Sequence, residues 1–186
     1  CLFLSEGITD ALDHSSPEAL VGGKLGIDLT ASYSPRAPES VDSSALRERL
    51  SALIPEVCEV TQYMRHTANP ITVVSVKKLG RSVRECFASL ETLKEFLRIV
   101  VFVDQEKNDI HNPYMLVWRV TNNIDAQRDV YRRESIVALD GTTKTVVDGF
   151  EREWPGDVEC TPAVVERLKS LGVWDLDPKL EKKYQL

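Results

Sequence analysis

Two short segments of this chain, residues 71–76 and 98–103, are almost entirely apolar and rich in β-branched residues. Runs of this kind are typical of strands that are covered on both faces, as in parallel sheets. The segment between them predicts a helix, because Ser82 and Glu85 fit a capping box and an apolar face follows. That face comprises Val83, Phe87, Leu90, Leu93 and Leu97. A strand, a helix and a second apolar strand in this order predict a layered α/β fold.

The rest of the chain continues this alternation. Strands are predicted at residues 57–62 and 135–139, where apolar and β-branched residues again cluster. Helices are predicted where a capping residue or a proline precedes an apolar periodicity. One begins after Asp42 or Ser43, one has Asn112 as its N-cap and Pro113 at its first position, and the last starts at Thr161-Pro162. Together these elements predict a three-layer α/β sandwich, with a largely parallel central sheet between two layers of helices.

The predicted domain covers residues 1–173, and residues 174–186 form a C-terminal tail that is either solvated or docked on another subunit. Residues 31–44 contain two prolines and several serines, a composition that favours an exposed loop. The helix after Asn112 has two alternative core faces. One consists of Val117, Thr121 and Ile124, and the other of Leu116 and Val120.

Charge and cysteine usage limit the functional classes. The 186 residues carry a formal net charge of −6, whereas a nucleic-acid surface needs a basic stripe. No apolar run reaches the roughly 20 residues of a membrane span, and no signal-peptide pattern is present. The four cysteines, Cys1, Cys58, Cys86 and Cys160, form no CxxC pair. We therefore expect buried, reduced thiols, no metal site and a cytoplasmic protein.

Six polar residues in predicted turns and at strand ends are candidates for the wall of a binding cleft. They are Asp13, His14, Lys24, Arg65, His66 and Asp104. Ligands of open α/β sheets bind beyond the carboxyl ends of parallel strands. Because Arg65, His66 and Asp104 all follow predicted strands, we expect them to occupy equivalent strand-exit positions. For Asp104, as for Asp13 and His14, a solvated or backbone-capping turn is the simpler interpretation.

More specific chemistry at these residues is not supported by their spacing. Lys24 lies in Gly-Gly-Lys-Leu, whereas a phosphate-binding loop needs a first glycine six residues before the lysine and a hydroxyl residue directly after it. Asp13 and His14 are adjacent in the sequence, whereas a Ser-His-Asp site is assembled from separated positions. Residues 104–109 lack the central glycine of a calcium loop. A hydrolase that uses His14 or His66 stays open as an alternative.

Several blocks of the sequence, taken in order, resemble one family, the UbiD-type decarboxylases. The blocks are residues 12–17, residues 22–28, residues 104–129 with the stretch Asn-Pro-Tyr-Met-Leu-Val-Trp-Arg and the later Arg128-Asp129 pair, and Glu153-Trp154-Pro155. The resemblance is to the C-terminal domain of that family and covers most of residues 1–170. Residues 138–142 also repeat the strand-then-Asp pattern of residues 26–30. This echo reflects either a partial duplication or the common way in which a buried strand ends.

The resemblance implies a fragment of a larger enzyme. In the family, an arginine and two glutamates next to a prenylated FMN perform proton transfer in the decarboxylation of aromatic or unsaturated acids. They belong to an upstream flavin domain, which also holds the cofactor with its divalent metal, and no segment here matches their motif. We therefore expect no catalytic, cofactor-binding or metal-binding residue in this chain, and little activity of the chain alone.

The expected role is to close the active site over the upstream flavin domain and to hold subunits together as a homodimer or larger homo-oligomer. The long insert before residue 57 and the region around Cys160 resemble the larger bacterial members linked to quinone biosynthesis. The alternative is a stand-alone α/β module that binds a nucleotide or small acid at the carboxyl ends of its strands. Against it, the chain has no Gly-x-Gly-x-x-Gly motif after its first strand.

Overall fold

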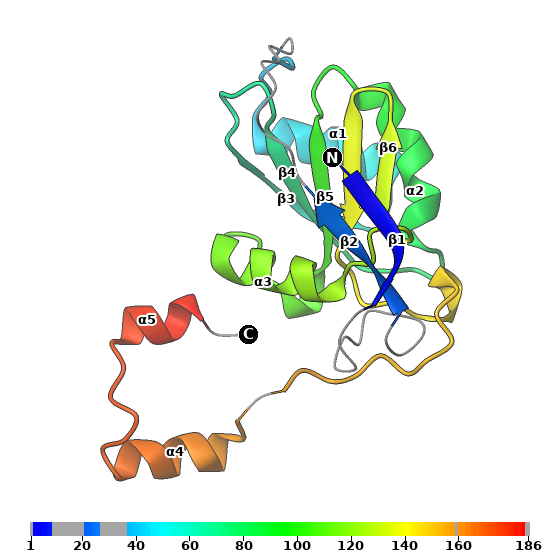
Figure 1. The fold of residues 1–186 in the computed structure, drawn as a ribbon. Helices are drawn as coiled ribbons and strands as arrows, with labels where there is room; N and C mark the ends of the chain where they lie inside the picture. Colours follow the sequence, from blue (N-terminus) through cyan, green and yellow to red (C-terminus); the bar gives the residue numbers. More distant parts are fainter. Residues whose placement is uncertain (1, 9–20, 27–36, 159, 185–186) are drawn as a thin grey trace.

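The computed structural model of the chain describes residues 2–8, 21–26, 37–158 and 160–184. Its strands are β1 (Leu2–Ile8), β2 (Val21–Gly26), β3 (Val57–Tyr63), β4 (Ile71–Val76), β5 (Ile99–Asp104), β6 (Val130–Arg133) and β7 (Ile136–Asp140). Its α-helices are α1 (Ser43–Leu53), α2 (Val83–Leu90), α3 (Pro113–Asn123), α4 (Pro162–Ser170) and α5 (Pro178–Lys183), and its short 3-10 helices are η1 (Glu91–Leu93), η2 (Gln105–Lys107) and η3 (Val146–Asp148). Figure 1 shows their arrangement.

The main sheet has five strands in the order β3-β4-β5-β7-β6. β4, β5 and β7 run parallel, and the two outer strands, β3 and β6, run antiparallel to their neighbours. The predicted α/β fold is therefore confirmed, and the parallel part of the sheet is its centre. β6 was not predicted, because its Val-Tyr-Arg-Arg sequence has too few apolar residues to show a strand pattern. The strands β1 and β2 pair with each other in a separate antiparallel ribbon.

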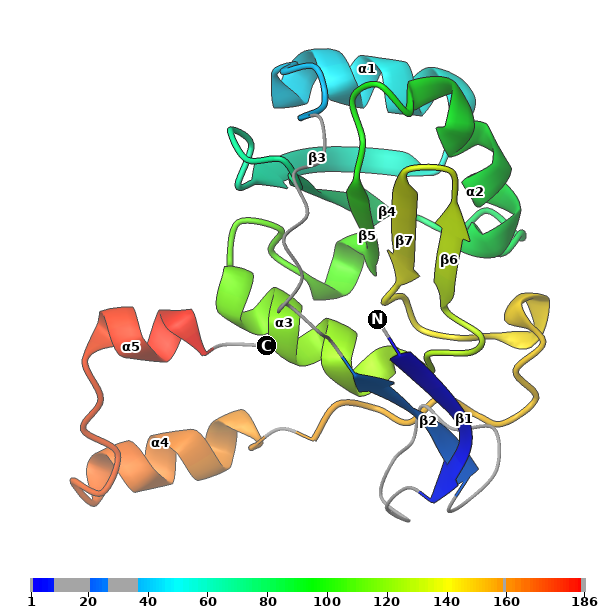
Figure 2. The same ribbon diagram turned by 45° about the horizontal axis from the view of Figure 1, so that its top comes forward.

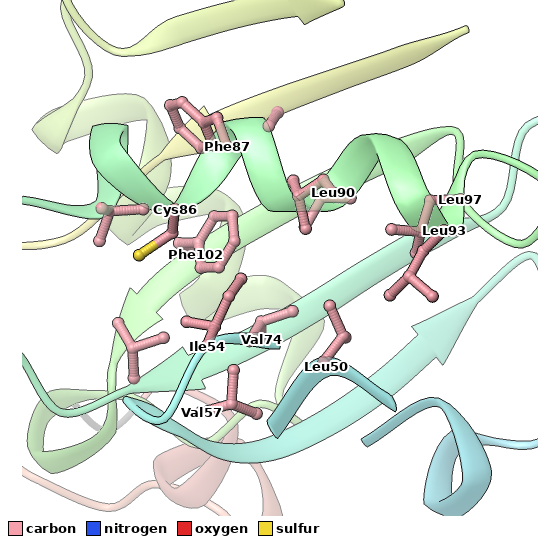
Figure 3. Packing of buried hydrophobic residues seen from close by; sticks show 14 of the residues in the cluster. Leu50, Ile54, Val57, Val74, Cys86, Phe87, Leu90, Leu93, Leu97 and Phe102 are labelled. Carbon is pink, nitrogen blue, oxygen red and sulfur yellow. The ribbon is translucent and has the colours of Figure 1, made fainter. Parts of the chain in front are cut away.

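Helices cover both faces of the main sheet, which gives the three layers. Alternate residues of β4 and β5 point to opposite faces, as the period of a strand requires. On one face, Val74 and Phe102 join the side chains of α1 and α2 in the larger hydrophobic cluster, shown in Figure 3. On the other face, Val73 and Val101 pack against Leu116 and Val120 of α3. Both strands are buried on both faces because each face has its own helical layer.

Local capping places the helices where the sequence predicts them. The Asp42 carboxylate accepts hydrogen bonds from the backbone N–H groups of Ser44 and Ala45, both at 2.9 Å. Helix α1 therefore begins at Ser43, so the predicted exposed loop ends at residue 42 rather than 44. Its residues 31–36 lie outside the described part. The capping box of α2 forms as predicted, because the Glu85 side chain accepts a hydrogen bond from the backbone N–H of Ser82.

Helix α3 buries one of its two predicted core faces and exposes the other. Leu116 and Val120 are buried against the sheet, whereas Val117 and Trp118 are exposed. The helix comes very close to the turn after β7, where a Cβ atom on Gly141 would lie 2.9 Å from Cγ2 of Val120 and 3.1 Å from a backbone oxygen. Gly141 is therefore required by this close approach.

The C-terminal arm, which we define as residues 151–184 without residue 159, leaves the sheet as an extended segment. Figure 2 shows that α4 lies away from the sheet and that α5 returns toward α3. The helix predicted after Thr161 is confirmed as α4, and α5 follows it. Cys160 is exposed on this arm, so the expectation of buried cysteines is wrong there; Cys86 is buried and Cys58 is partly buried, and these three thiols are free.

We predict that Gly141→Ala lowers the free energy of unfolding by about 1–3 kcal/mol, because the new methyl group overpacks the contact with Val120. Urea unfolding followed by circular dichroism measures the change. Gly156→Ala is the matched control, since nothing lies within 4 Å of a Cβ atom built there. Equal stability of the two variants would contradict the close-approach argument.

Candidate functional site

The carboxyl ends of the three parallel strands meet at one edge of the sheet, which we call the carboxyl edge. Asp104, the last residue of β5, lies there. Arg65 and His66 do not, because β3 runs antiparallel to β4. Tyr63 at the end of β3 pairs with Ile71, and Ile71 pairs with Ile99 at the start of β5. The expectation that Arg65 and His66 share an equivalent position with Asp104 is therefore wrong, and both are exposed at the opposite edge.

The other three candidates give no side-chain geometry. Asp13 and His14 lie outside the described residues. Lys24 lies within β2, where its backbone pairs with that of Leu4; its side chain is not described. Their proposed place in the cleft wall stays a prediction.

A buried lysine is the centre of the polar structure at the carboxyl edge. Lys144 is only 1% exposed. Its Nζ donates hydrogen bonds to the backbone oxygens of Asp140 and Thr142, both at 2.7 Å. The same atom lies 3.2 Å from Oδ1 of Asp140 and 3.7 Å from Oδ1 of Asp129. The ammonium group is thus compensated by two buried carboxylates, as a charge in the interior must be.

The two carboxylates have further partners. Arg128 binds Asp129 through two hydrogen bonds, from Nε at 2.8 Å and from Nη2 at 2.7 Å. The backbone N–H of Asp125 also donates to Asp129, at 2.8 Å. Burial raises the pKa of Asp129, and the hydrogen bond from Arg128 and the charge of Lys144 oppose this shift. Asp140 accepts hydrogen bonds from the backbone N–H and the hydroxyl of Thr142, at 3.0 and 2.6 Å.

A second group of contacts ties the loops after β4, β5 and β7 together. Asp104 accepts a 2.7 Å hydrogen bond from the backbone N–H of Thr143. Lys78 donates to the backbone oxygen of Thr143 at 2.6 Å and to Oδ2 of Asp148 at 2.8 Å. Asp104 is therefore a loop anchor rather than a free carboxylate. Two buried atoms here, Oγ1 of Thr143 and Oδ1 of Asp148, have no hydrogen-bond partner among the described residues.

We call these seven side chains the edge cluster: Lys78, Asp104, Arg128, Asp129, Asp140, Lys144 and Asp148. Most of these charged side chains pair with each other or with backbone groups. The cluster is therefore suited to hold loops in place and not to attack a substrate. Sequence reasoning noted Asp104, the Arg128-Asp129 pair and the echo at residues 138–142, but it missed Lys144. Its position four residues after Asp140 could have indicated this role. An aspartate at the end of a strand can accept a hydrogen bond from a lysine side chain that folds back over the turn.

The joined loops carry apolar side chains toward solvent. Leu79 is 65% exposed and Val146 is 79% exposed, and Val147 beside it is also exposed. We call these three residues the edge patch. Lys78 directly precedes Leu79 in the sequence, and Asp148 directly follows Val147. Lys78 and Asp148 form an ion pair, which links the two parts of the patch. The arrangement therefore presents apolar groups on two loops that are fixed relative to each other.

Neither a metal centre nor a membrane-spanning helix is found in the described part of the chain. There, no group of three or more His, Cys, Asp or Glu residues could hold a metal ion. No helix within the same residues is long and apolar enough to cross a bilayer.

One family model matches most of this chain, and uncharacterised relatives match it over a longer stretch. Residues 36–149 match the family described as the 3-octaprenyl-4-hydroxybenzoate carboxy-lyase C-terminal domain. An uncharacterised protein of Helicobacter pylori is 43% identical over 183 residues, which is 98% of this chain but 30% of that protein. One from Archaeoglobus fulgidus is 28% identical over 142 residues, covering 66% of this chain and 29% of its own length. The chain thus spans about 30% of the length of these curated relatives.

Among solved structures, the chain is similar to the closed form of vanillic acid decarboxylase from Sedimentibacter hydroxybenzoicus. The TM-score is 0.50 at 23% sequence identity, over 69% of this chain and 31% of that one. At this level of identity the similarity concerns the fold. It agrees with the α/β architecture described above.

We predict that Lys144→Met lowers the free energy of unfolding by about 3–5 kcal/mol, because it leaves Asp129 and Asp140 buried beside a lost cation. Lys77→Met is the control, since Lys77 is largely exposed and its contact with Glu106 is long, at 3.7 Å. Thermal and urea unfolding measure both variants. A Lys144→Met variant as stable as Lys77→Met would show that the edge cluster does not stabilise the fold.

Proposed function

The chain belongs to the family of 3-octaprenyl-4-hydroxybenzoate carboxy-lyase C-terminal domains, and from this premise we propose that it closes the active site of a UbiD-like decarboxylase. The family description and the blocks of residues around Asn112 and Arg128 support this role. The chemistry itself would take place on a flavin domain upstream, in a longer protein to which this chain would contribute the C-terminal domain. Domain closure would exclude water from the reacting centre, as lids do in other enzymes.

The edge patch is the observation that carries this proposal. It lies at the carboxyl edge of the parallel strands, where open α/β sheets meet their ligands. Exposed apolar side chains such as Leu79 and Val146 are stabilised when a partner surface covers them. We propose that the flavin domain is that cover.

The cations of the edge cluster are not available to bind the prenylated FMN that we propose for the full-length enzyme. A flavin phosphate needs cationic side chains or free backbone N–H groups. At the carboxyl edge Lys78, Arg128 and Lys144 are already bound to carboxylates or carbonyl oxygens. We therefore propose that the cofactor and its divalent metal are held by the flavin domain, and that this chain supplies the opposite wall of the cleft.

We propose an aromatic or unsaturated carboxylic acid as the substrate of the full-length enzyme, in quinone biosynthesis. The family description names 3-octaprenyl-4-hydroxybenzoate as a substrate of its namesake. The vanillic acid decarboxylase of similar fold acts on another hydroxylated aromatic acid, as its name states. The structure does not favour the alternative of a stand-alone binding module. It also does not favour a hydrolase that uses His66, because His66 lies at the edge of the sheet opposite to the carboxyl edge.

The C-terminal arm supports a second part of the proposal, an intersubunit contact. Helices α4 and α5 are joined by a 3.1 Å ion pair between Lys169 and Glu181. Between them lies a groove of about 890 Å³, whose walls include Val165, Leu176 and Leu180. The indole N–H of Trp174 is buried in this region without an acceptor among the described residues. We propose that a second copy of the chain covers the groove in a homodimer.

We predict that Val146→Asp in the full-length protein lowers decarboxylase activity about tenfold or more, because a charge in an apolar contact opposes closure. Carbon dioxide release measures activity, and the flavin absorption spectrum measures bound cofactor, which should not change. Val117→Asp, at an exposed valine of α3 outside the edge patch and the C-terminal arm, is the control for a surface charge. Normal activity of Val146→Asp would exclude the edge patch from the closing surface.

We predict that the chain has a solution mass of at least twice its 20.9 kDa, because a groove this apolar is stabilised by a partner. Light scattering after size exclusion measures the mass. Truncation after residue 173 should yield a folded monomer, with circular dichroism as the check of folding. A monomeric full chain, or a truncated chain that still dimerises, would remove the arm from the contact.

A further inference from the structure

Helix α5 takes part in two hollows of the molecule. A cavity of about 520 Å³ lies beside the first turns of α3, and its walls include Asn112, Met115 and, from α5, Lys182. The groove of the C-terminal arm, about 890 Å³, is also lined by Lys182, together with Leu180 and Tyr184. The position of α5 relative to α3 therefore determines the shape of both hollows.

The two helices of the arm have little packing of their own to fix this position. Neither α4 nor α5, all of whose residues the structure describes, contains a buried residue. Helix α5 has six residues, and isolated helices shorter than about 12 residues are marginal in water. The ion pair between Lys169 and Glu181 joins α5 to α4, so we expect the two helices to move together. Their place on the domain depends on individual side-chain contacts.

Three contacts join the end of α5 to the start of α3, which it approaches in Figure 2. Nδ2 of Asn112 donates a 3.0 Å hydrogen bond to the backbone oxygen of Lys183. Nζ of Lys183 lies 3.6 Å from the centre of the Tyr114 ring, within the range of a cation–π contact. The rings of Tyr114 and Tyr184 pack edge to face, with their centres 5.9 Å apart. Tyr114 thus takes part in two of the three contacts.

The contact residues on α3 are oriented by that helix itself. Asn112 caps α3, because its Oδ1 accepts a 3.3 Å hydrogen bond from the backbone N–H of Met115. This bond uses the oxygen of the amide and leaves its nitrogen for α5. Neither Tyr114 nor Lys183 is among the described residues that line the groove. A change at either side chain therefore reaches the groove through the position of α5.

We propose that Asn112, Tyr114, Lys183 and Tyr184 form a latch, and that this latch positions the groove of the arm for a second copy of the chain. The positioning role rests on the subunit contact proposed above. With the latch closed, α4 and α5 hold one orientation, so little conformational freedom is lost when the second copy binds. With the latch open, fewer chains are competent to dimerise, and the apparent dissociation constant of the dimer rises in proportion. Tyr114 is therefore a positioning residue for a contact that it does not touch.

The test compares two latch variants of the full chain, Tyr114→Ala and Lys183→Gln, with matched controls. Val117→Ala is the control on α3, where Val117 is exposed one turn after Tyr114. Lys179→Gln is the control on α5, where Lys179 is also exposed. Hydrogen exchange of residues 178–184 reports the latch, and sedimentation equilibrium measures the dissociation constant of the dimer. Circular dichroism checks the fold, which should not change because Tyr114 is 55% exposed.

We expect Tyr114→Ala to speed hydrogen exchange of residues 178–184 and to raise the dissociation constant of the dimer about tenfold, because fewer chains hold the closed latch. Lys183→Gln should act in the same direction, and both controls should match the unchanged chain. The double variant Tyr114→Ala with Lys183→Gln should dimerise only slightly less well than Tyr114→Ala. The two changes remove the same cation–π contact, so their effects should not add.

The possible failures can be told apart. A Tyr114→Ala dimer as tight as that of the unchanged chain would overturn the positioning role and leave the subunit contact standing. Unchanged hydrogen exchange of residues 178–184 in both latch variants would show that these contacts do not hold α5, which overturns the latch itself. A monomeric unchanged chain would overturn the subunit contact proposed above and the positioning role with it, and hydrogen exchange would then still decide the latch.

Discussion

Lys144 is buried between Asp129 and Asp140, and the loops at the carboxyl edge of the sheet depend on it. An uncompensated charge in the interior is far more costly than most single contacts in a protein. The sequence therefore has to bring two carboxylates and two backbone oxygens to one ammonium group. Once it does, the turn after β7 and the segment before β6 are held together, and the remaining loops can attach to them.

Further contacts around Lys144 hold the neighbouring segments in place. Arg128 fixes Asp129 from the other side, and Gly141 lets α3 approach the same turn. Lys78 and Asp104 then bind the loop that contains Thr143. The result is a set of joined loops in which the edge cluster lies inward and the edge patch faces outward. A surface of this kind is suited to contact another domain, because little conformational freedom is lost when the contact forms.

The sequence predicted the elements whose signals are local. The capping residues Asp42, Ser82 and Asn112 and the apolar runs of β4 and β5 determine these elements by neighbours within a few positions. What failed depends on distant pairing. The direction of β3 follows from its pairing with β4, and this direction separated His66 from Asp104. The role of Lys144 likewise depends on Asp129, which lies on another segment and becomes its neighbour only after the strands pair.

The two edge strands limit how this protein can assemble. β6 has four residues and ends in two exposed arginines, and β3 carries an exposed glutamate, Glu59, at its middle. Short length and outward charge are the features that keep sheet edges from pairing with other chains. A continuous sheet across two molecules is therefore disfavoured on both sides. For the main sheet, association is therefore left to its helices and loops, whose side chains can be matched to one partner without exposing the backbone to others.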